Sequence, residues 1–67
     1  MKIFINNKET ETDEHNSLKA VLSSLDNIPA SGFAVALNGD VVPAPKWGEI
    51  TISENDRITI IRAFYGG

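Results

Sequence analysis

The hydrophobic positions of this chain follow two different spacings. In the segments 2–6, 33–37 and 57–65, apolar residues alternate with polar ones or run continuously, as is typical of half-buried and buried β-strands. In one segment they recur three and four positions apart, which predicts an amphipathic helix with a single apolar face. The residues of that face are Leu18, Val21, Leu22 and Leu25. Ser17 can cap this helix, and the proline-containing segment 26–29 is expected to end it.

Polar turn sequences join the strands into hairpins. Asn6-Asn7-Lys8 follows the first strand, and because asparagine tolerates positive φ we expect a polar return strand after it. Asn38-Gly39 is the strongest hairpin signal in the chain and predicts a return strand at Val41-Val42. The segment 43–48 contains two prolines and is expected to be irregular. The predicted order is therefore strand, strand, helix and three strands.

This order predicts an α+β fold. The apolar helix face needs an apolar partner, and only one face of the sheet can provide it. The expected partner residues are Ile3, Ile5, Ile58 and Ile60. The last strand is apolar on both faces, which suits a central strand, and the long connection from the first strand allows the two to run parallel. We expect a ubiquitin-like β-grasp fold: a mixed sheet of four to five strands with one helix on one face, and one domain over 1–67 with a flexible C-terminal Gly-Gly arm.

Composition and charge exclude several classes of partner. Six Lys and Arg against nine Asp and Glu give a net charge of -3, whereas binding to a nucleic-acid duplex requires clustered cations. Four acids crowd together at Glu9, Glu11, Asp13 and Glu14. We expect them to form a solvated edge, with docking of a basic partner as the alternative. The N-terminus has no signal-peptide layout and no apolar run is long enough to span a membrane, so we expect a cytoplasmic protein that is monomeric when free and binds neither nucleic acid nor membrane.

Residues for catalysis or metal binding are few. The chain has no cysteine and only one histidine, His15, which excludes a Cys-ligated metal, a histidine dyad and a His-assisted nucleophile within one chain. We expect His15 in a solvent-facing loop. The five glycines of the chain form no phosphate-binding loop after a strand, and the spacing of the acidic residues in 9–14 matches no calcium-binding loop. Trp47 is expected to plug the open end of a small core, or, if exposed, to contact a partner.

The C-terminal segment holds the candidate functional residues. The sequence closes with Gly66-Gly67 directly after an apolar run, and residues without a Cβ can pass extended through a tunnel too narrow for side chains. A frayed terminus is the alternative. Ile61, Ala63 and Tyr65 share the strand face opposite the helix-facing isoleucines, and at most one of Phe64 and Tyr65 can point into the core. We expect these residues to form an exposed apolar patch that docks on a partner.

Several of these segments together resemble the ThiS family, the sulfur carriers of thiamine biosynthesis, over essentially the whole chain. The resemblance lies in the opening strand 3–6, the Leu-rich helix face, the segment 33–39, the pattern Val42-Pro43-x-x-x-Trp47 and the terminal Gly66-Gly67. It implies that the chain is a protein substrate and not an enzyme. A ThiF-type adenylating enzyme would use ATP to adenylate the Gly67 carboxylate, and sulfur from a persulfide donor would displace AMP to give a thiocarboxylate. A ThiG-type thiazole synthase would then receive the sulfur. The carrier itself would bind no cofactor.

Other sulfur carriers and modifiers remain as alternatives. Family members often have smaller residues than Tyr65 before the two glycines, which bears on how deeply the arm can enter a partner. The small subunit of molybdopterin synthase has the same fold and terminus but is usually longer. A ubiquitin-related protein modifier would use the same activated carboxylate, and an inert β-grasp binding module would use none.

Overall fold

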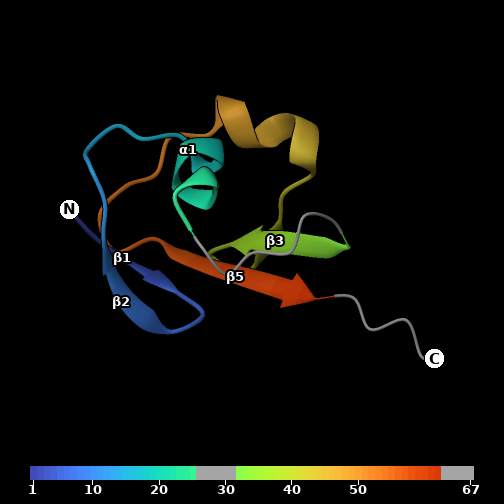
Figure 1. The fold of residues 1–67 in the computed structure, drawn as a ribbon, viewed down its shortest axis with the longest axis horizontal. Coiled ribbons are helices and arrows are strands. Elements are labelled where there is room, and N and C mark those ends of the chain that lie inside the picture. Colours follow the sequence, from blue (N-terminus) through green and yellow to red (C-terminus); the bar gives the residue numbers. More distant parts are fainter. Residues whose placement is uncertain (26–31, 63–67) are drawn as a thin grey trace.

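The computed structural model describes residues 1–25 and 32–62, and of Arg62 the backbone (Figure 1). The predicted helix end at 26–29 and the terminal residues 63–67 lie outside this range. In chain order the elements are β1 (Lys2–Ile5), β2 (Lys8–Glu11), α1 (Leu18–Ser23), β3 (Phe33–Leu37), β4 (Asp40–Val41), the 3-10 helix η1 (Ala44–Glu49) and β5 (Arg57–Arg62). The predicted order is confirmed, with η1 added between β4 and β5.

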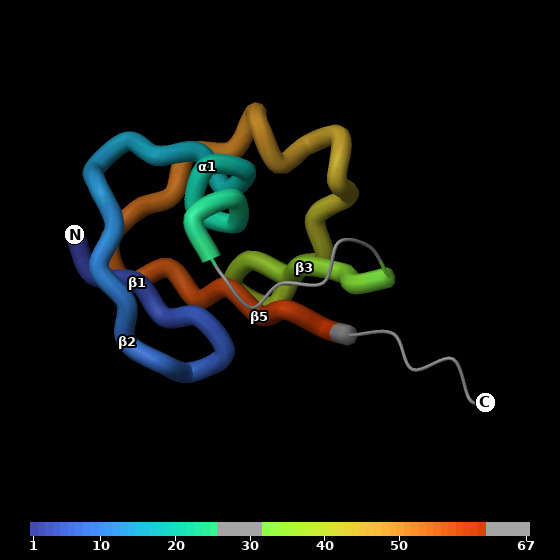
Figure 2. Tube along the Cα trace, viewed as in Figure 1, coloured from blue at the N-terminus to red at the C-terminus, as the bar shows by residue number. Residues whose placement is uncertain are grey.

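The five described strands form one mixed sheet in the order β2-β1-β5-β3-β4. β5 lies in the centre, parallel to β1 and antiparallel to β3, as the sequence predicted. α1 and η1 lie on one side of this sheet (Figures 1 and 2). The expected α+β arrangement, a mixed sheet with a helix against one face, is therefore confirmed.

Both hairpins turn through two residues with positive φ. Asn6 and Asn7 have φ of 51° and 67°, and Asn38 and Gly39 have φ of 51° and 91°. Positive φ at both central positions is the mark of the type I′ turn, which matches the twist of antiparallel strands. The second return strand is Asp40–Val41, which begins one residue before the expected position.

The helix is capped as predicted but is shorter than predicted. The Ser17 Oγ accepts a hydrogen bond from the Ala20 N–H at 3.0 Å. The helix ends at Ser23, before the segment 26–29 that was expected to end it. The Ser24 hydroxyl donates to the Val21 carbonyl at 2.7 Å, and such side-chain bonds compete with continuation of the helical ladder. Leu25 consequently lies beyond the helix, although it still packs against the core.

The core lies between α1 and the helix-facing side of the sheet. Its fully buried members come from separate parts of the sequence: Ile3, Leu18, Val35, Ile52 and Ile58. Val21, Leu22 and Val42 complete the buried cluster, and Ile5 and Ile60 pack against it while partly buried. The predicted meeting of the helix face with isoleucines of the first and last strands is confirmed.

The segment 43–48 is not irregular, contrary to the sequence-based expectation. Residues 44–48 belong to η1, Pro43 occupies the N-cap position before it, and the Lys46 N–H donates to the Pro43 carbonyl at 2.8 Å. A short 3-10 helix accepts prolines at its start because the first N–H groups of a helix have no partner within it. Trp47 packs against the core as the expected plug: its Nε1–H donates to the Val42 carbonyl at 2.8 Å, and its ring stacks on Phe33 with centroids 5.6 Å apart.

Candidate functional site

Of the predicted site residues, only Ile61 belongs to the described part of the chain. Gly67, the expected site of modification, Gly66, and the docking candidates Ala63, Phe64 and Tyr65 lie outside it. Ile61 is 47% exposed on β5. The expectation that its side chain faces solvent is confirmed, and its role in docking remains a prediction.

β5 presents two different faces because successive side chains of a strand point to opposite sides. Ile58 is buried in the core and Ile60 packs against it, so both face α1. Arg57, Thr59 and Ile61 alternate with them and are exposed. They lie on the side of the sheet opposite α1 and η1, which we call the outer face, and β5 is its central strand (Figure 1).

Apolar side chains gather on the outer face around Ile61, although the polar Thr59 lies opposite Ala36 on the same face. Ile61 pairs with Ala34 across β5 and β3, and Ala36 pairs with Val41 across β3 and β4. Val41 is 65% exposed, and it and Ile61 are the large hydrophobic residues most exposed in the described part of the chain. The two short alanine side chains lie between them in the sheet. We call these four residues, Ala34, Ala36, Val41 and Ile61, the outer apolar patch.

Val41 was not among the docking residues predicted from the sequence. The signal that could have identified it is the alternation at Val41-Val42, where one valine must face the core and the other must face away from it. Val42 is the buried one, and its N–H donates to the Val35 carbonyl at 2.8 Å. The exposed neighbour therefore falls on the outer face.

The part of the outer face around Phe4 is charged. The Phe4 ring has the Lys2 Nζ 5.7 Å from its centroid on β1 and the Arg57 Cζ 4.7 Å from its centroid on β5. β2 places Glu9 opposite Phe4 and Glu11 opposite Lys2. Two cations thus lie between the outer apolar patch and an acidic edge strand.

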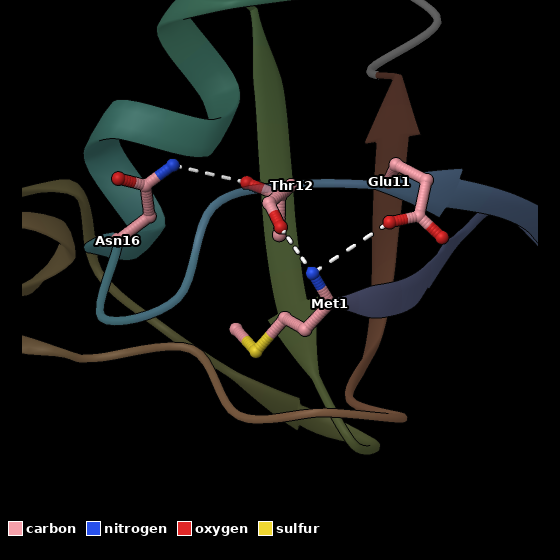
Figure 3. Close-up of polar contacts among 4 residues, drawn as sticks. All are labelled: Met1, Glu11, Thr12 and Asn16. Atoms are coloured by element: carbon pink, nitrogen blue, oxygen red, sulfur yellow. Dashed lines mark hydrogen bonds and ion pairs between the residues drawn. The ribbon is translucent and has the colours of Figure 1, made fainter.

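The acidic edge is exposed as expected, and the carboxylate of Glu11 forms an ion pair with the N-terminal amine of Met1. All four acids of the cluster are exposed: Glu9, Glu11, Asp13 and Glu14. The Met1 amine donates to the Thr12 carbonyl at 2.6 Å and lies 3.6 Å from the Glu11 Oε2, while the Asn16 amide donates to the Thr12 hydroxyl at 3.0 Å (Figure 3). The alternative, that this edge docks a basic partner, stays a prediction.

The described residues bring together no other set of reactive side chains. His15 is exposed in a loop with φ of 65°, as expected. Within residues 1–25 and 32–62, no three histidine or acidic side chains approach closely enough to hold a metal ion. No helix in these ranges is long and apolar enough to cross a membrane. The outer face, with its apolar and charged parts, is the feature of the described chain best suited to binding a partner.

A family model, a curated relative and a solved structure all match this chain, and all three are of ThiS. The model of the ThiS family matches residues 2–67. The sulfur carrier protein ThiS of Escherichia coli K12 is 27% identical over 67 residues, which cover the whole of both chains. The crystal structure of the thiamine biosynthesis protein (ThiS) from Geobacter metallireducens superposes with a TM-score of 0.86 at 26% identity and also covers both chains completely.

Proposed function

The chain belongs to the ThiS family, whose members are small sulfur carriers of thiamine biosynthesis and not catalysts, and we propose that this carrier holds its sulfur as a thiocarboxylate on Gly67. The observation that carries the proposal is that the match to the ThiS family model extends through Gly66 and Gly67. The same match favours thiazole formation over the molybdopterin and protein-modifier alternatives.

The chemistry requires activation because a carboxylate oxygen is a poor leaving group. A ThiF-type enzyme would bind ATP and transfer AMP to the Gly67 carboxylate, releasing pyrophosphate. The outer sulfur of a persulfide would then attack the carbonyl carbon, and AMP would leave with the electron pair of the C–O bond. The product is an acyl disulfide, and a second thiol would attack its inner sulfur, forming a disulfide with the donor and releasing the thiocarboxylate. In this scheme the carrier binds no cofactor itself, and Gly66 and Gly67 supply reach without bulk.

The outer apolar patch is the proposed docking surface for the enzymes that act on Gly67. Ile61 and Val41 are well exposed, whereas Ala36 of the same patch is only 6% exposed. Exposed apolar surface rimmed by polar residues on a small protein commonly marks a binding site for another protein. Ile61 precedes Gly67 by only six positions, so a partner that holds the patch also holds the chain close to its reactive end. Ala63, Phe64 and Tyr65 would extend the contact. The partners would be the ThiF-type enzyme and a ThiG-type thiazole synthase.

Intact-mass measurement tests the proposal. After incubation with the cognate adenylating enzyme, ATP and a persulfide donor, we expect a mass gain equal to replacement of one oxygen by one sulfur, and fragmentation should place it on Gly67. Deletion of Gly67 should abolish the gain while leaving the thermal melt unchanged, because the buried cluster of the described residues runs from Ile3 to Ile58 and a glycine has no side chain to add to it. An unchanged mass, with an enzyme that modifies a second carrier in the same assay, would contradict the proposal.

A further inference from the structure

The central strand β5 extends past the end of one of its neighbours. β3 pairs with β5 along the range Ile58–Arg62. β1 pairs with it only at Phe4↔Arg57 and Ile5↔Ile58, because the chain then turns at Asn6. In Figure 1 the arrow of β5 accordingly runs beyond the β1–β2 hairpin. Among the described residues, the C-terminal part of β5 is therefore paired on one side and lies at an edge of the sheet on the other.

Hydrogen bonds identify which backbone groups point to that edge. The Asp56 and Ile58 carbonyls accept from the Phe4 and Asn6 N–H groups, each at 2.9 Å, so even-numbered residues of β5 point toward β1. The Ile60 N–H continues this series, but its partner is the Asn6 side chain, whose Oδ1 lies at 2.8 Å. The strand alternation then directs the Ile60 carbonyl and the Arg62 N–H to the same side. Among the described residues, no strand pairs with these two groups.

We propose that this edge of β5, from Ile60 to Arg62, is where an extended segment of the enzyme that activates Gly67 adds as a further strand. The inference rests on the proposed function, since it names how that enzyme holds the carrier. An exposed strand edge presents donors and acceptors at fixed spacing, and an extended peptide can satisfy them by main-chain hydrogen bonds. The partner must supply one carbonyl that accepts from the Arg62 N–H and one N–H that donates to the Ile60 carbonyl.

The outer apolar patch favours a partner enzyme over a second copy of this chain as the occupant. Within the described residues only two backbone groups of this edge lack a strand partner, and two hydrogen bonds are too few to hold an added strand by themselves, since even a complete two-stranded hairpin is marginally stable in water. The occupant must therefore also contact the outer apolar patch, as the enzyme that acts on Gly67 is proposed to do. Ile61 lies between Ile60 and Arg62 and belongs to the outer apolar patch, so the edge is continuous with the proposed docking surface. A strand added here would place every second side chain over the outer face beside Ile61, where an apolar residue is expected. The same pairing would fix the backbone direction of the chain that leads toward Gly67.

The variants Arg62→Pro and Arg62→Ala separate the backbone group from the side chain. Both remove the arginine, but only proline removes the N–H that points to the edge, and β3 does not use that N–H. We expect Arg62→Pro to bind the adenylating enzyme about five- to tenfold more weakly than Arg62→Ala, the loss of about one hydrogen bond, with closely similar melting curves. Amide exchange supplies a second readout on the unmodified chain: enzyme should slow exchange at Arg62 by at least about tenfold and leave the β3-facing Ile61 amide unchanged.

Three results would overturn the inference. These are equal affinities of the proline and alanine variants, an Arg62 amide whose exchange does not respond to the enzyme, and a free chain that is dimeric but becomes monomeric on Arg62→Pro. The mass assay on Gly67, run on the same wild-type sample, distinguishes the two proposals. If wild type gains sulfur while the two variants bind alike, only the edge inference fails. If wild type gains none, the proposed function fails.

Discussion

Ile58 and Ile61 are the same residue type on the same strand, yet one is 1% exposed and the other 47% exposed. They differ only in which face of β5 they occupy. Ile58 belongs to the buried cluster beneath α1, and Ile61 belongs to the outer apolar patch. The comparison shows that one strand supplies both the core of this carrier and its proposed docking surface, so hydrophobic residues of β5 cannot be assigned to stability as a group.

The size of the chain explains why the two faces differ. A domain of this length buries only roughly 60% of the surface that its unfolded chain exposes. The described chain has one short helix, Leu18–Ser23, and with η1 it covers one face of the sheet. The opposite face carries the small side chains of Ala34 and Ala36 and the ring of Phe4, which lies between the cations of Lys2 and Arg57. Among residues 1–25 and 32–61, the large apolar side chains that remain exposed are Ile61 and Val41.

The largest expected effect comes from truncating the two isoleucines in parallel. Ile58→Ala should lower the free energy of unfolding by about 2–5 kcal/mol, because it removes buried methyl groups and leaves a cavity beneath α1. Ile61→Ala should cost less than about 1 kcal/mol, chiefly through the lower strand preference of alanine. Urea denaturation of both variants checks the difference. Equal losses in the two variants would contradict the assignment of the two faces.

Local sequence patterns were sufficient to predict most of the fold. The Asn-rich turns, the Ser17 cap and the alternation of the last strand each act through neighbouring residues, and all three are present in the structure. η1 was missed because a short 3-10 helix repeats every three residues and leaves no long amphipathic pattern, while its prolines are compatible with both a loop and a helix start. The early end of α1 coincides with a bond from the Ser24 hydroxyl to the Val21 carbonyl, and the sequence does not indicate whether a serine bonds its own helix or faces solvent.

A charge placed in the outer apolar patch should separate binding from stability. Ile61→Asp should weaken binding to the adenylating enzyme by at least about 1–2 kcal/mol, because it puts a carboxylate where an apolar surface is expected to be buried. Ala44→Asp is the matched control: it adds the same charge at an exposed position of η1, on the other side of the sheet. Calorimetric titration measures the affinities, and a melt of each variant measures stability. If both variants bind like wild type, or if Ile61→Asp unfolds the chain, Ile61 is not a docking residue.

The candidate site was harder to predict than the fold because it depends on how distant segments meet. Ile61 could be placed on the outer face from the strand alternation alone. The outer apolar patch also needs Val41, whose position beside Ala36 follows from the pairing of β3 with β4. The contact between Asn6 and Ile60 joins residues 54 positions apart, and no local pattern indicates that an asparagine predicted for its turn geometry also completes the pairing of β5.

The smallest expected effect tests where the pairing of β5 with the β1 side ends. Asn6 and Asn7 are neighbours with similar positive φ and both are exposed, but only the Asn6 side chain is hydrogen-bonded among the described residues. Glycine keeps the turn geometry of either position, so Asn6→Gly removes little more than the bond to the Ile60 N–H. We expect Asn6→Gly to lower the free energy of unfolding by about 1 kcal/mol and Asn7→Gly to leave it nearly unchanged. Amide exchange at Ile60 should become faster in Asn6→Gly alone, since that N–H would then lie at the open edge beside Arg62. Unaltered exchange at Ile60 in Asn6→Gly would show that another group protects this amide and that the open edge of β5 begins farther along the strand.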